Sequence, residues 1–351
     1  MRLSSRGKKV LAIGGGIVVL AVGALLLLGG RDAVSDIPGL GALDPEPETC
    51  PLSGIEPTKE SRLDRPAIAV KIVNSPAAYP LSGLESAEIV YEELVEGGIT
   101  RFLAMYHCTD AELAGPIRSA RVIDPSIMTP TTYILAFSGA NQHVFGRLDE
   151  AGIVQIEENA AGDAMQRIDN GKSFEYTLFA DTAAVRKLGR KDYDEPPPED
   201  VYVFEDELPE GKSRKATEIT IEFSPASVVS YTYDGGEYYR YQDGEPFMSD
   251  TGDQIAVDNV LIEMHSVNLT GPTDVVGTAG TEIADVTGSG RAVLFRDGRV
   301  IRGKWVREAI EDPVRFTTKD GAELVLKPGT TWIHLVPNQN GEVKGSFEFE
   351  K

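Results

Sequence analysis

Acidic and basic side chains are concentrated between residues 92 and 121, among apolar runs and two glycine-bearing turns. Formal charges this close to segments of buried character need partners, because an unpaired buried charge is costly. The cluster is therefore either a structural network of ion pairs or a site for a charged ligand. Its candidate site residues are Glu92, Glu93, Glu96, Arg101, Arg118, Ser119 and Arg121.

Two kinds of chemistry fit these residues. Arginines that converge on one pocket would bind phosphate, carboxylate or sulfate, since guanidinium groups donate paired hydrogen bonds to such anions. The carboxylates would alternatively act as general acid or base in an enzyme for envelope glycans or phosphorylated precursors. No G-x-S-x-G nucleophile motif accompanies them. Ligand binding is therefore the preferred interpretation, and no catalytic residue is assigned.

A β-hairpin and a following turn are expected to position these side chains. Residues 88–95 (EIVYEELV) alternate imperfectly between apolar and acidic, as a half-buried strand does. Residues 99–108 (ITRFLAMYHC) form a second strand after a tight turn at Gly97-Gly98. The later arginines follow Gly115-Pro116, a turn that would bring them back towards the hairpin.

Alternation along the first strand separates its carboxylates. Glu92 and Glu96 would share one face, with Glu93 on the other. A cross-strand pair between a glutamate and Arg101 is expected, since arginine favours two-pronged contact with a carboxylate. The sequence leaves open whether the carboxylates neutralise the arginines or leave them free for a ligand.

Composition divides the chain into five parts. Residues 1–30 are a basic flank and an apolar run, and residues 31–49, rich in Pro, Gly and acid, read as a flexible tether. Residues 50–191 form an N-terminal α/β unit, and residues 192–214, with three consecutive prolines, form an exposed connector. Residues 215–351 form a β-rich unit. The predicted fold class is α+β, preceded by one transmembrane helix.

In the N-terminal unit, apolar strands are expected at 66–73 and 133–138. Helical spacing predicts a helix at 142–153, and a second helix at 181–188 is N-capped by Asp181.

The C-terminal unit is expected to be mostly β. Asp297-Gly298 and Asp320-Gly321 are turn signals between hairpin strands. A row of tyrosines on one sheet face is expected, for core packing or alternatively for carbohydrate stacking. Its members are Tyr231, Tyr233, Tyr239 and Tyr241. Strand-like runs lie at 216–223, 227–233, 237–242, 259–267, 291–305, 313–318 and 322–329.

The N-terminus reads as a membrane anchor. A charge-free run, 10–30, follows four basic residues and is long enough for a helix that crosses a bilayer. The basic flank should stay cytoplasmic, which places the rest of the chain outside the cell membrane as a single-pass protein. A cleaved signal peptide is the alternative, although its apolar region is usually shorter.

The remainder of the chain is strongly acidic. Removing the four basic residues of the flank from the total of 34 leaves 30 Lys and Arg against 55 Asp and Glu, a net charge of −25. This charge disfavours nucleic acid as a partner. The histidines are not spaced as metal ligands, and there is no cysteine cluster, so neither a metal nor a cofactor is predicted.

Two cysteines, Cys50 and Cys108, lie in the expected extracytoplasmic part. An oxidising compartment favours a disulfide between them. Two separate thiols are the alternative, and the geometry would decide.

The segments VYEELVEGGITRFLAMY and GPIRSAR resemble the signature of the YerB-like bacterial lipoproteins, a family of domains of unknown function. The similarity covers most of residues 60–340. It implies a two-part extracytoplasmic α/β protein with no settled activity and supplies no catalytic residues. Lipoproteins of this kind often carry a lipidated cysteine directly after the apolar run. Here Cys50 lies far beyond Gly30, so the helix itself is expected to anchor the chain.

These observations predict a membrane-anchored extracytoplasmic protein of the bacterial cell envelope. It would bind an anionic envelope ligand or an envelope protein through its Arg/Glu cluster.

Overall fold

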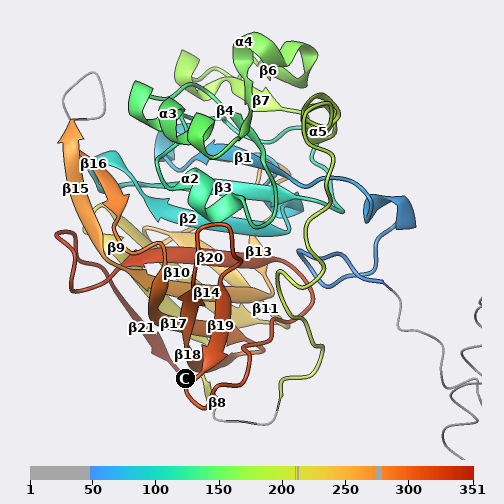
Figure 1. Ribbon diagram of the computed structural model, residues 1–351. Helices are drawn as coiled ribbons and strands as arrows, with labels where there is room; N and C mark the ends of the chain where they lie inside the picture. Colours follow the sequence, from blue (N-terminus) through green and yellow to red (C-terminus); the bar gives the residue numbers. More distant parts are fainter. Residues whose placement is uncertain (1–47, 210, 212, 273–278) are drawn as a thin grey trace, which may run out of the picture. The chain divides into compact units, whose positions relative to one another are not determined.

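The computed structural model describes residues 48–209, 211, 213–272 and 279–351 (Figure 1). Residues 49–351 form one compact unit. The expected membrane helix and nearly all of the expected tether lie outside the described residues. Within the described ranges, no helix is long and apolar enough to cross a membrane.

A mixed sheet of eleven strands forms the centre of this unit. Its order is β19-β18-β17-β14-β20-β2-β3-β1-β4-β5, and β8 pairs with β18. The strands are β1 (Ile68–Val73), β2 (Ile89–Leu94), β3 (Thr100–Tyr106), β4 (Ile134–Phe137), β5 (Val154–Glu157), β8 (Ser213–Lys215), β14 (Asn259–His265), β17 (Gly288–Arg296), β18 (Arg299–Arg307), β19 (Arg315–Thr318) and β20 (Thr331–Pro337).

The two halves of the chain share this sheet. Strand β20 pairs in parallel with β14 on one side and with β2 on the other. All seven residues of β20 are buried, so its sequence TWIHLVP shows little of the alternation that marks a half-exposed strand. β20 is not among the strands that the sequence pattern predicts, yet it joins both halves.

A second, antiparallel sheet covers one face of the central sheet. Residues of both sheets belong to one apolar core, in which Phe102 of β3 contacts Phe247 with ring centroids 5.9 Å apart. The strand order of this second sheet is β12-β11-β10-β9-β21, and β13 pairs with β11. The strands are β9 (Glu218–Ser224), β10 (Ser227–Asp234), β11 (Glu237–Gln242), β12 (Glu245–Pro246), β13 (Ala256–Val257) and β21 (Ser346–Glu350).

Helices cover the N-terminal part of the central sheet. Helices α2 (Asp124–Met128) and α3 (Gln142–Glu150) bury apolar side chains in a core on the face opposite the second sheet. Helix α5 (Thr182–Gly189) packs Val185 into the core of the other face. Besides short 3-10 turns, the chain forms the short helix α4 (Glu158–Ala161) and two ribbons. The ribbons pair β6 (Met165–Arg167) with β7 (Leu178–Ala180) and β15 (Val267–Pro272) with β16 (Ala279–Ile283).

The expected hairpin is confirmed, since β2 and β3 pair antiparallel around Gly97, whose φ is 75°. The N-cap of α5 is also as predicted, because the Asp181 side chain accepts the Ala184 N–H at 2.9 Å. The strand predicted at 322–329 is wrong. The backbone of this segment does not form the regular hydrogen bonds of a strand. The Lys327 N–H, for example, donates to the side-chain oxygen of Asn259.

The predicted tyrosine row is also wrong. Tyr231 lies opposite Arg240 in the β10–β11 pair and faces the core. Tyr239 and Tyr241 pair with Thr232 and Ser230, so they lie on the opposite face. The odd-numbered tyrosines of β10 and β11 are separated because the pairing register places odd positions opposite even ones.

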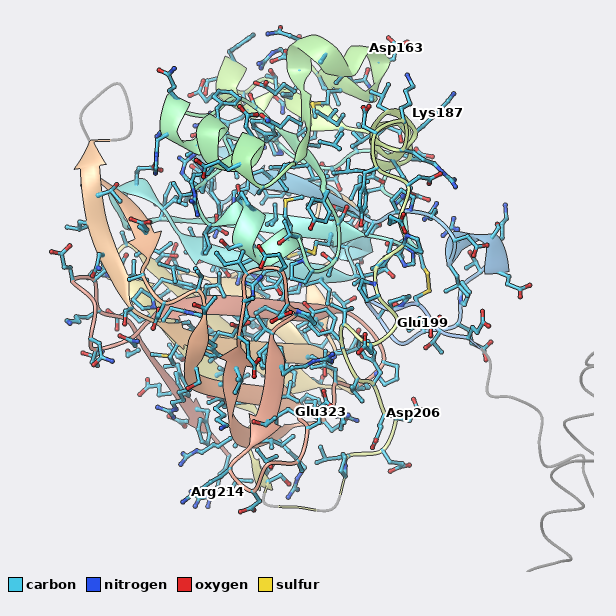
Figure 2. The ribbon with its side chains drawn as sticks, in the orientation of Figure 1. Asp163, Lys187, Glu199, Asp206, Arg214 and Glu323 are labelled. Atoms are coloured by element: carbon cyan, nitrogen blue, oxygen red, sulfur yellow. A yellow bond between two sulfur atoms is a disulfide. The ribbon has the colours of Figure 1, made fainter. Side chains whose placement is uncertain are left out.

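The connector between the two halves is only partly exposed. Val201 and Tyr202 are buried, and the Tyr202 hydroxyl lies 2.9 Å from that of Tyr91 on β2. Glu199 and Asp206 point outwards on either side of this buried part (Figure 2). The connector therefore packs onto the central sheet through its apolar residues, while its acids stay in water.

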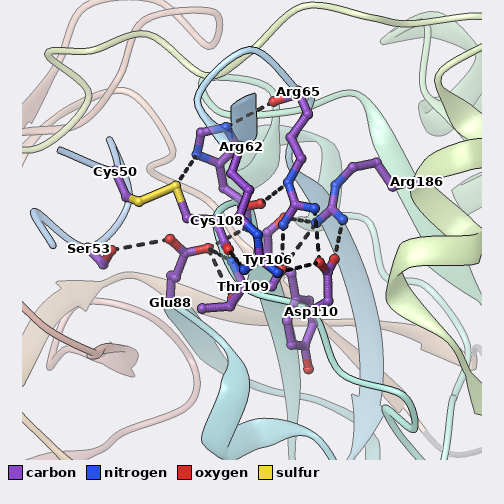
Figure 3. The surroundings of a disulfide bond; sticks show 11 residues. Cys50, Ser53, Arg62, Arg65, Glu88, Tyr106, Cys108, Thr109, Asp110 and Arg186 are labelled. Atoms are coloured by element: carbon purple, nitrogen blue, oxygen red, sulfur yellow. Dashed lines mark hydrogen bonds and ion pairs between the residues drawn. A yellow bond between two sulfur atoms is a disulfide. The ribbon is translucent and has the colours of Figure 1, made fainter. Parts of the chain in front are cut away.

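Cys50 and Cys108 form the predicted disulfide, with Cα atoms 6.1 Å apart (Figure 3). Beside it, Asp110 binds Arg65 at 2.9 Å and Arg186, while Glu88 accepts the Ser53 hydroxyl at 3.2 Å. The bond ties the first described residues to the end of β3.

Removing this disulfide should destabilise the protein. It closes a loop of 58 positions, so the variant Cys50→Ala/Cys108→Ala should lose about 2–4 kcal/mol of unfolding free energy in urea titrations. A reductant should produce a similar loss in the wild type and none in the variant. Equal stability of the oxidised wild type and the variant would contradict the prediction.

Candidate functional site

The predicted cluster lies where the parallel strands of the central sheet end, beside β1, β2 and the start of β3. Strands β1 and β2 both run antiparallel to β3, so they point the same way, as do their parallel neighbours β4, β5, β14 and β20. Their carboxyl ends therefore meet at one edge. In open sheets of this kind, ligands commonly bind outside the carboxyl ends of the strands.

The segment after the Gly115-Pro116 turn runs along this edge. The Arg118 N–H donates to the carbonyl of Lys71 near the end of β1, at 2.9 Å. The Arg118 carbonyl accepts the N–H of Ser138, the residue after β4, at 3.0 Å. The turn thus brings the later arginines back to the hairpin, as the sequence predicts.

Arg101 lies at the start of β3 and is 8% exposed. Its Nη1 donates to the Ser119 carbonyl at 3.0 Å, while its buried Nε has no hydrogen-bond partner among the residues that the structure describes. Burial and repulsion by Arg121 and Arg118 outweigh the attraction of Glu96 and Glu93 and lower the pKa of Arg101 to about 9. Within the described part of the chain, no carboxylate pairs with this guanidinium, so its charge is poorly compensated.

Arg121 and Arg118 differ in their partners. Arg121 Nε donates to Glu96 at 3.1 Å, and its Nη1 donates to the carbonyl of Ser119 at 3.1 Å. Arg118 lies over the ring of Tyr176 at 5.4 Å, and its buried Nε has no hydrogen-bond partner in the described ranges. Arg101 and Arg121 thus converge on one carbonyl. Ser119 contributes that backbone oxygen to the cluster.

Glu93 does not form the cross-strand pair with Arg101. It lies opposite Arg101 in the register but is ion-paired with Lys71 of β1, which also binds Asp124 of α2. The side chains of Lys71, Glu93 and Asp124 are all almost fully buried. The Asp124 carboxylate also accepts the backbone N–H of Arg121 at 2.6 Å. Burial and Asp124 together outweigh Lys71 and raise the pKa of Glu93 to about 7.

Lys71 and Asp124 are functional-site candidates that sequence reasoning missed. A lysine inside the apolar run PAIAVKIV was the available signal, since a buried lysine needs a carboxylate partner.

Glu92 does not join the arginine cluster, because strand alternation turns it to the other face. It is fully buried between the two sheets, where Arg240 of β11 lies 3.2 Å away and His334 Nδ1 lies 3.0 Å away. Thr100 donates to it at 2.6 Å. Burial alone would raise the pKa of Glu92, but Arg240 and His334 hold it below its usual value.

Aromatic rings enclose Arg240. Its guanidinium carbon lies 4.6 Å from the Phe247 ring centroid and 4.8 Å from that of Trp332. Such contacts stabilise a cation that has left water. The Glu92–Arg240 pair is therefore sealed inside the protein.

The edge cluster carries a surplus of positive charge. Its four basic groups are Lys71, Arg101, Arg118 and Arg121, and its three acidic groups are Glu93, Glu96 and Asp124. Protonation of Glu93 would enlarge the surplus. This local balance contrasts with the net charge of −21 of the whole chain.

A cleft gives access to this edge. Its volume is about 440 Å³, and it is lined by Arg121, Glu96, the start of α3 and residues of the β15–β16 ribbon, among them Thr281 and Glu282. Of the three arginines, Arg121 is the one that lines it among the described residues. Asn141 caps α3 by accepting the Val144 N–H at 2.9 Å. The positive end of the α3 dipole therefore also faces the cleft.

Within the described ranges, the only group of three or more potential metal ligands close enough to share an ion is Cys50, Glu88 and Cys108. Both sulfurs are bonded in the disulfide, so this group offers a metal one carboxylate alone.

Comparisons with known proteins place the chain in a family. Residues 52–194 match the model described as "Protein of unknown function (DUF3048) N-terminal domain", and residues 219–333 match the corresponding C-terminal domain. The protein named "Putative lipoprotein YerB" from Bacillus subtilis (strain 168) is 28% identical over 318 residues, which cover 82% of this chain and 86% of the relative.

A solved structure shares the fold. The crystal structure of the YerB protein from Bacillus subtilis matches with a TM-score of 0.69 and 25% identity, covering 86% of this chain and 99% of that one. The match extends across both halves of the shared sheet. The chain therefore belongs to the DUF3048 family and is a homologue of YerB.

Proposed function

We propose that this protein is held at the cell membrane by its N-terminal apolar helix and binds an anionic ligand of the cell envelope on the outside. Two observations support the location: the apolar run 10–30 after a basic flank, and the name of the YerB relative as a lipoprotein. The binding site comprises Arg101, Arg118 and Arg121 at the carboxyl edge of the central sheet.

The incomplete compensation of Arg101 carries this proposal. A buried guanidinium that has no carboxylate partner among the described residues, beside two further arginines, costs the folded protein free energy. Such a cost is typical of sites that are preorganised for a ligand of opposite charge. The ligand class is a compact oxyanion, such as a phosphate, sulfate or carboxylate group, presented by an envelope polymer or an envelope protein.

The acid/base alternative receives less support from the candidate carboxylates. Glu92 is sealed between the sheets, Glu93 is 2% exposed and binds Lys71, and Glu96 binds Arg121. A general acid or base must reach its substrate within hydrogen-bond distance. The arginines and the neighbouring cleft therefore favour a binding protein.

Sulfate and phosphate binding to the full-length chain tests the proposal by calorimetry and thermal unfolding at matched ionic strength. Each of the variants Arg101→Met, Arg118→Ala and Arg121→Ala should weaken binding by about tenfold or more, since hydrogen bonds to charged groups are worth roughly 1.5–3 kcal/mol. Arg147→Ala, on the exposed side of α3, is the matched control and should bind like the wild type.

Stability separates a ligand site from a structural network. Arg101→Met should leave the unfolding free energy within about 1 kcal/mol of the wild type or raise it, because it removes an uncompensated buried charge. A large loss of stability, together with no anion binding by the wild type, would show that the arginines are structural and would refute the proposal.

A further inference from the structure

Glu93, Lys71 and Asp124 form a buried group of charges next to Arg101 and Arg121. Glu93 faces Arg101 across the β2–β3 pair. Asp124 accepts the Arg121 backbone N–H, and Lys71 binds both carboxylates. Any change of charge at Glu93 therefore acts on the same residues that would hold the anion.

The Glu93 carboxylate is only half satisfied. Its Oε1 binds Lys71, while its Oε2 is buried without a hydrogen-bond partner in the described part of the chain. Hydrogen bonds donated to its oxygens stabilise an ionised carboxylate, so an oxygen without a donor leaves the burial penalty on the charged form less offset and favours protonation. These contacts therefore allow Glu93 to be protonated near neutral pH, in agreement with its pKa of about 7.

The groups that face Glu93 come from three elements. Lys71 of β1 and Arg101 of β3 favour its ionised form, and Asp124 of α2 favours its protonated form. Arg118, Arg121 and Glu96 act on Arg101 and belong to the same cluster. Lys71 is shared between the carboxylates of Glu93 and Asp124, so one further negative charge near Arg101 would favour protonation of Glu93.

We propose that the anion site is coupled to protonation: an anion bound by Arg101 and Arg121 draws a proton from solvent onto Glu93, and the protein binds its ligand more tightly at acidic than at alkaline pH. This inference rests on the proposed anion-binding function. No covalent bond to the ligand forms or breaks, and the proton returns to solvent on release.

The direction of the effect follows from charge interaction and linkage. A bound anion repels the ionised Glu93 carboxylate and raises its pKa further. Because binding couplings are reciprocal, protonating Glu93 must strengthen anion binding by the same factor. A coupling of about one pKa unit corresponds to a change of roughly tenfold in affinity.

Sulfate is the suitable probe, since it stays a dianion throughout the neutral range. Isothermal titration calorimetry of the full-length chain should show the dissociation constant rising about fivefold from roughly pH 6 to pH 8. Titrations near neutrality in two buffers of different ionisation enthalpy should show net proton uptake on binding.

Two variants isolate Glu93. Glu93→Gln mimics the protonated form, so it should bind sulfate tightly with little pH dependence and no proton uptake. His143 is exposed at the cleft, so His143→Gln is the control and should keep the pH dependence of the wild type.

The outcomes separate this inference from the function on which it rests. Failure of the wild type to bind sulfate at any pH overturns the proposed function. Binding without pH dependence or proton uptake overturns the coupling alone, as does a pH dependence that Glu93→Gln keeps. If Glu93→Gln does not fold, the proton uptake of the wild type decides.

Discussion

Replacing Arg240 by alanine should lower the unfolding free energy by about 3–5 kcal/mol, because the change leaves Glu92 buried without its cation. Glu92 is fully buried and lies 3.2 Å from Arg240, with the remaining space filled by aromatic rings. Water cannot easily replace the lost guanidinium there. Urea denaturation followed by intrinsic fluorescence would measure the loss.

Two further variants test the cause of this effect. Arg147→Ala removes an arginine from an exposed ion pair and should change stability by less than about 1 kcal/mol. The double variant Glu92→Gln/Arg240→Met removes both charges and should be more stable than Arg240→Ala, since no unpaired charge remains. A loss below about 1 kcal/mol for Arg240→Ala would contradict the assignment of a sealed ion pair.

Replacing Lys71 by methionine should have an effect of similar size, about 3–5 kcal/mol at alkaline pH. The change retains the length of the side chain but leaves Glu93 and Asp124 close together without their shared cation. Lys187→Met, an exposed lysine of α5 (Figure 2), is the matched control and should alter stability by less than about 0.5 kcal/mol.

The penalty of Lys71→Met should depend on pH. The pKa of Glu93 is about 7 in the folded wild type, above that of an unfolded glutamate. The folded state therefore holds a proton that the unfolded state releases, and the associated stability is lost as pH rises through 7. Without Lys71 this pKa rises further. Denaturation midpoints measured from pH 5 to 9 should show a penalty that shrinks in acid, and a penalty constant across this range would contradict the role of Glu93.

Local sequence patterns determined the elements around the site. Alternation in residues 88–95, followed by Gly97-Gly98, specified the hairpin, because a glycine supplies the positive φ that the turn requires. The same alternation placed Glu92 and Glu93 on opposite faces. The spacing of apolar residues and an Asp cap specified α3 and α5. The cysteine pair was predictable from compartment and count.

The tertiary structure alone decided which charges meet. Lys71, Glu93 and Asp124 are joined by strand order and by the packing of α2, and no local pattern encodes either. Arg240 reaches Glu92 across 148 positions because the second sheet covers the first. β20 lies buried between the two halves, so its side chains lack the polar alternation that reveals an exposed strand.

Part of this protein is thus readable from its sequence: the hairpin, the Arg-bearing turn and the density of charge that needs partners. The partners themselves come from distant strands, because burial selects any group of opposite charge that packing brings within reach. Inside the core, Glu92 is neutralised by Arg240, and Lys71 by Glu93 and Asp124. The same packing left Arg101 without a carboxylate among the described residues, at the sheet edge where ligands bind in related architectures.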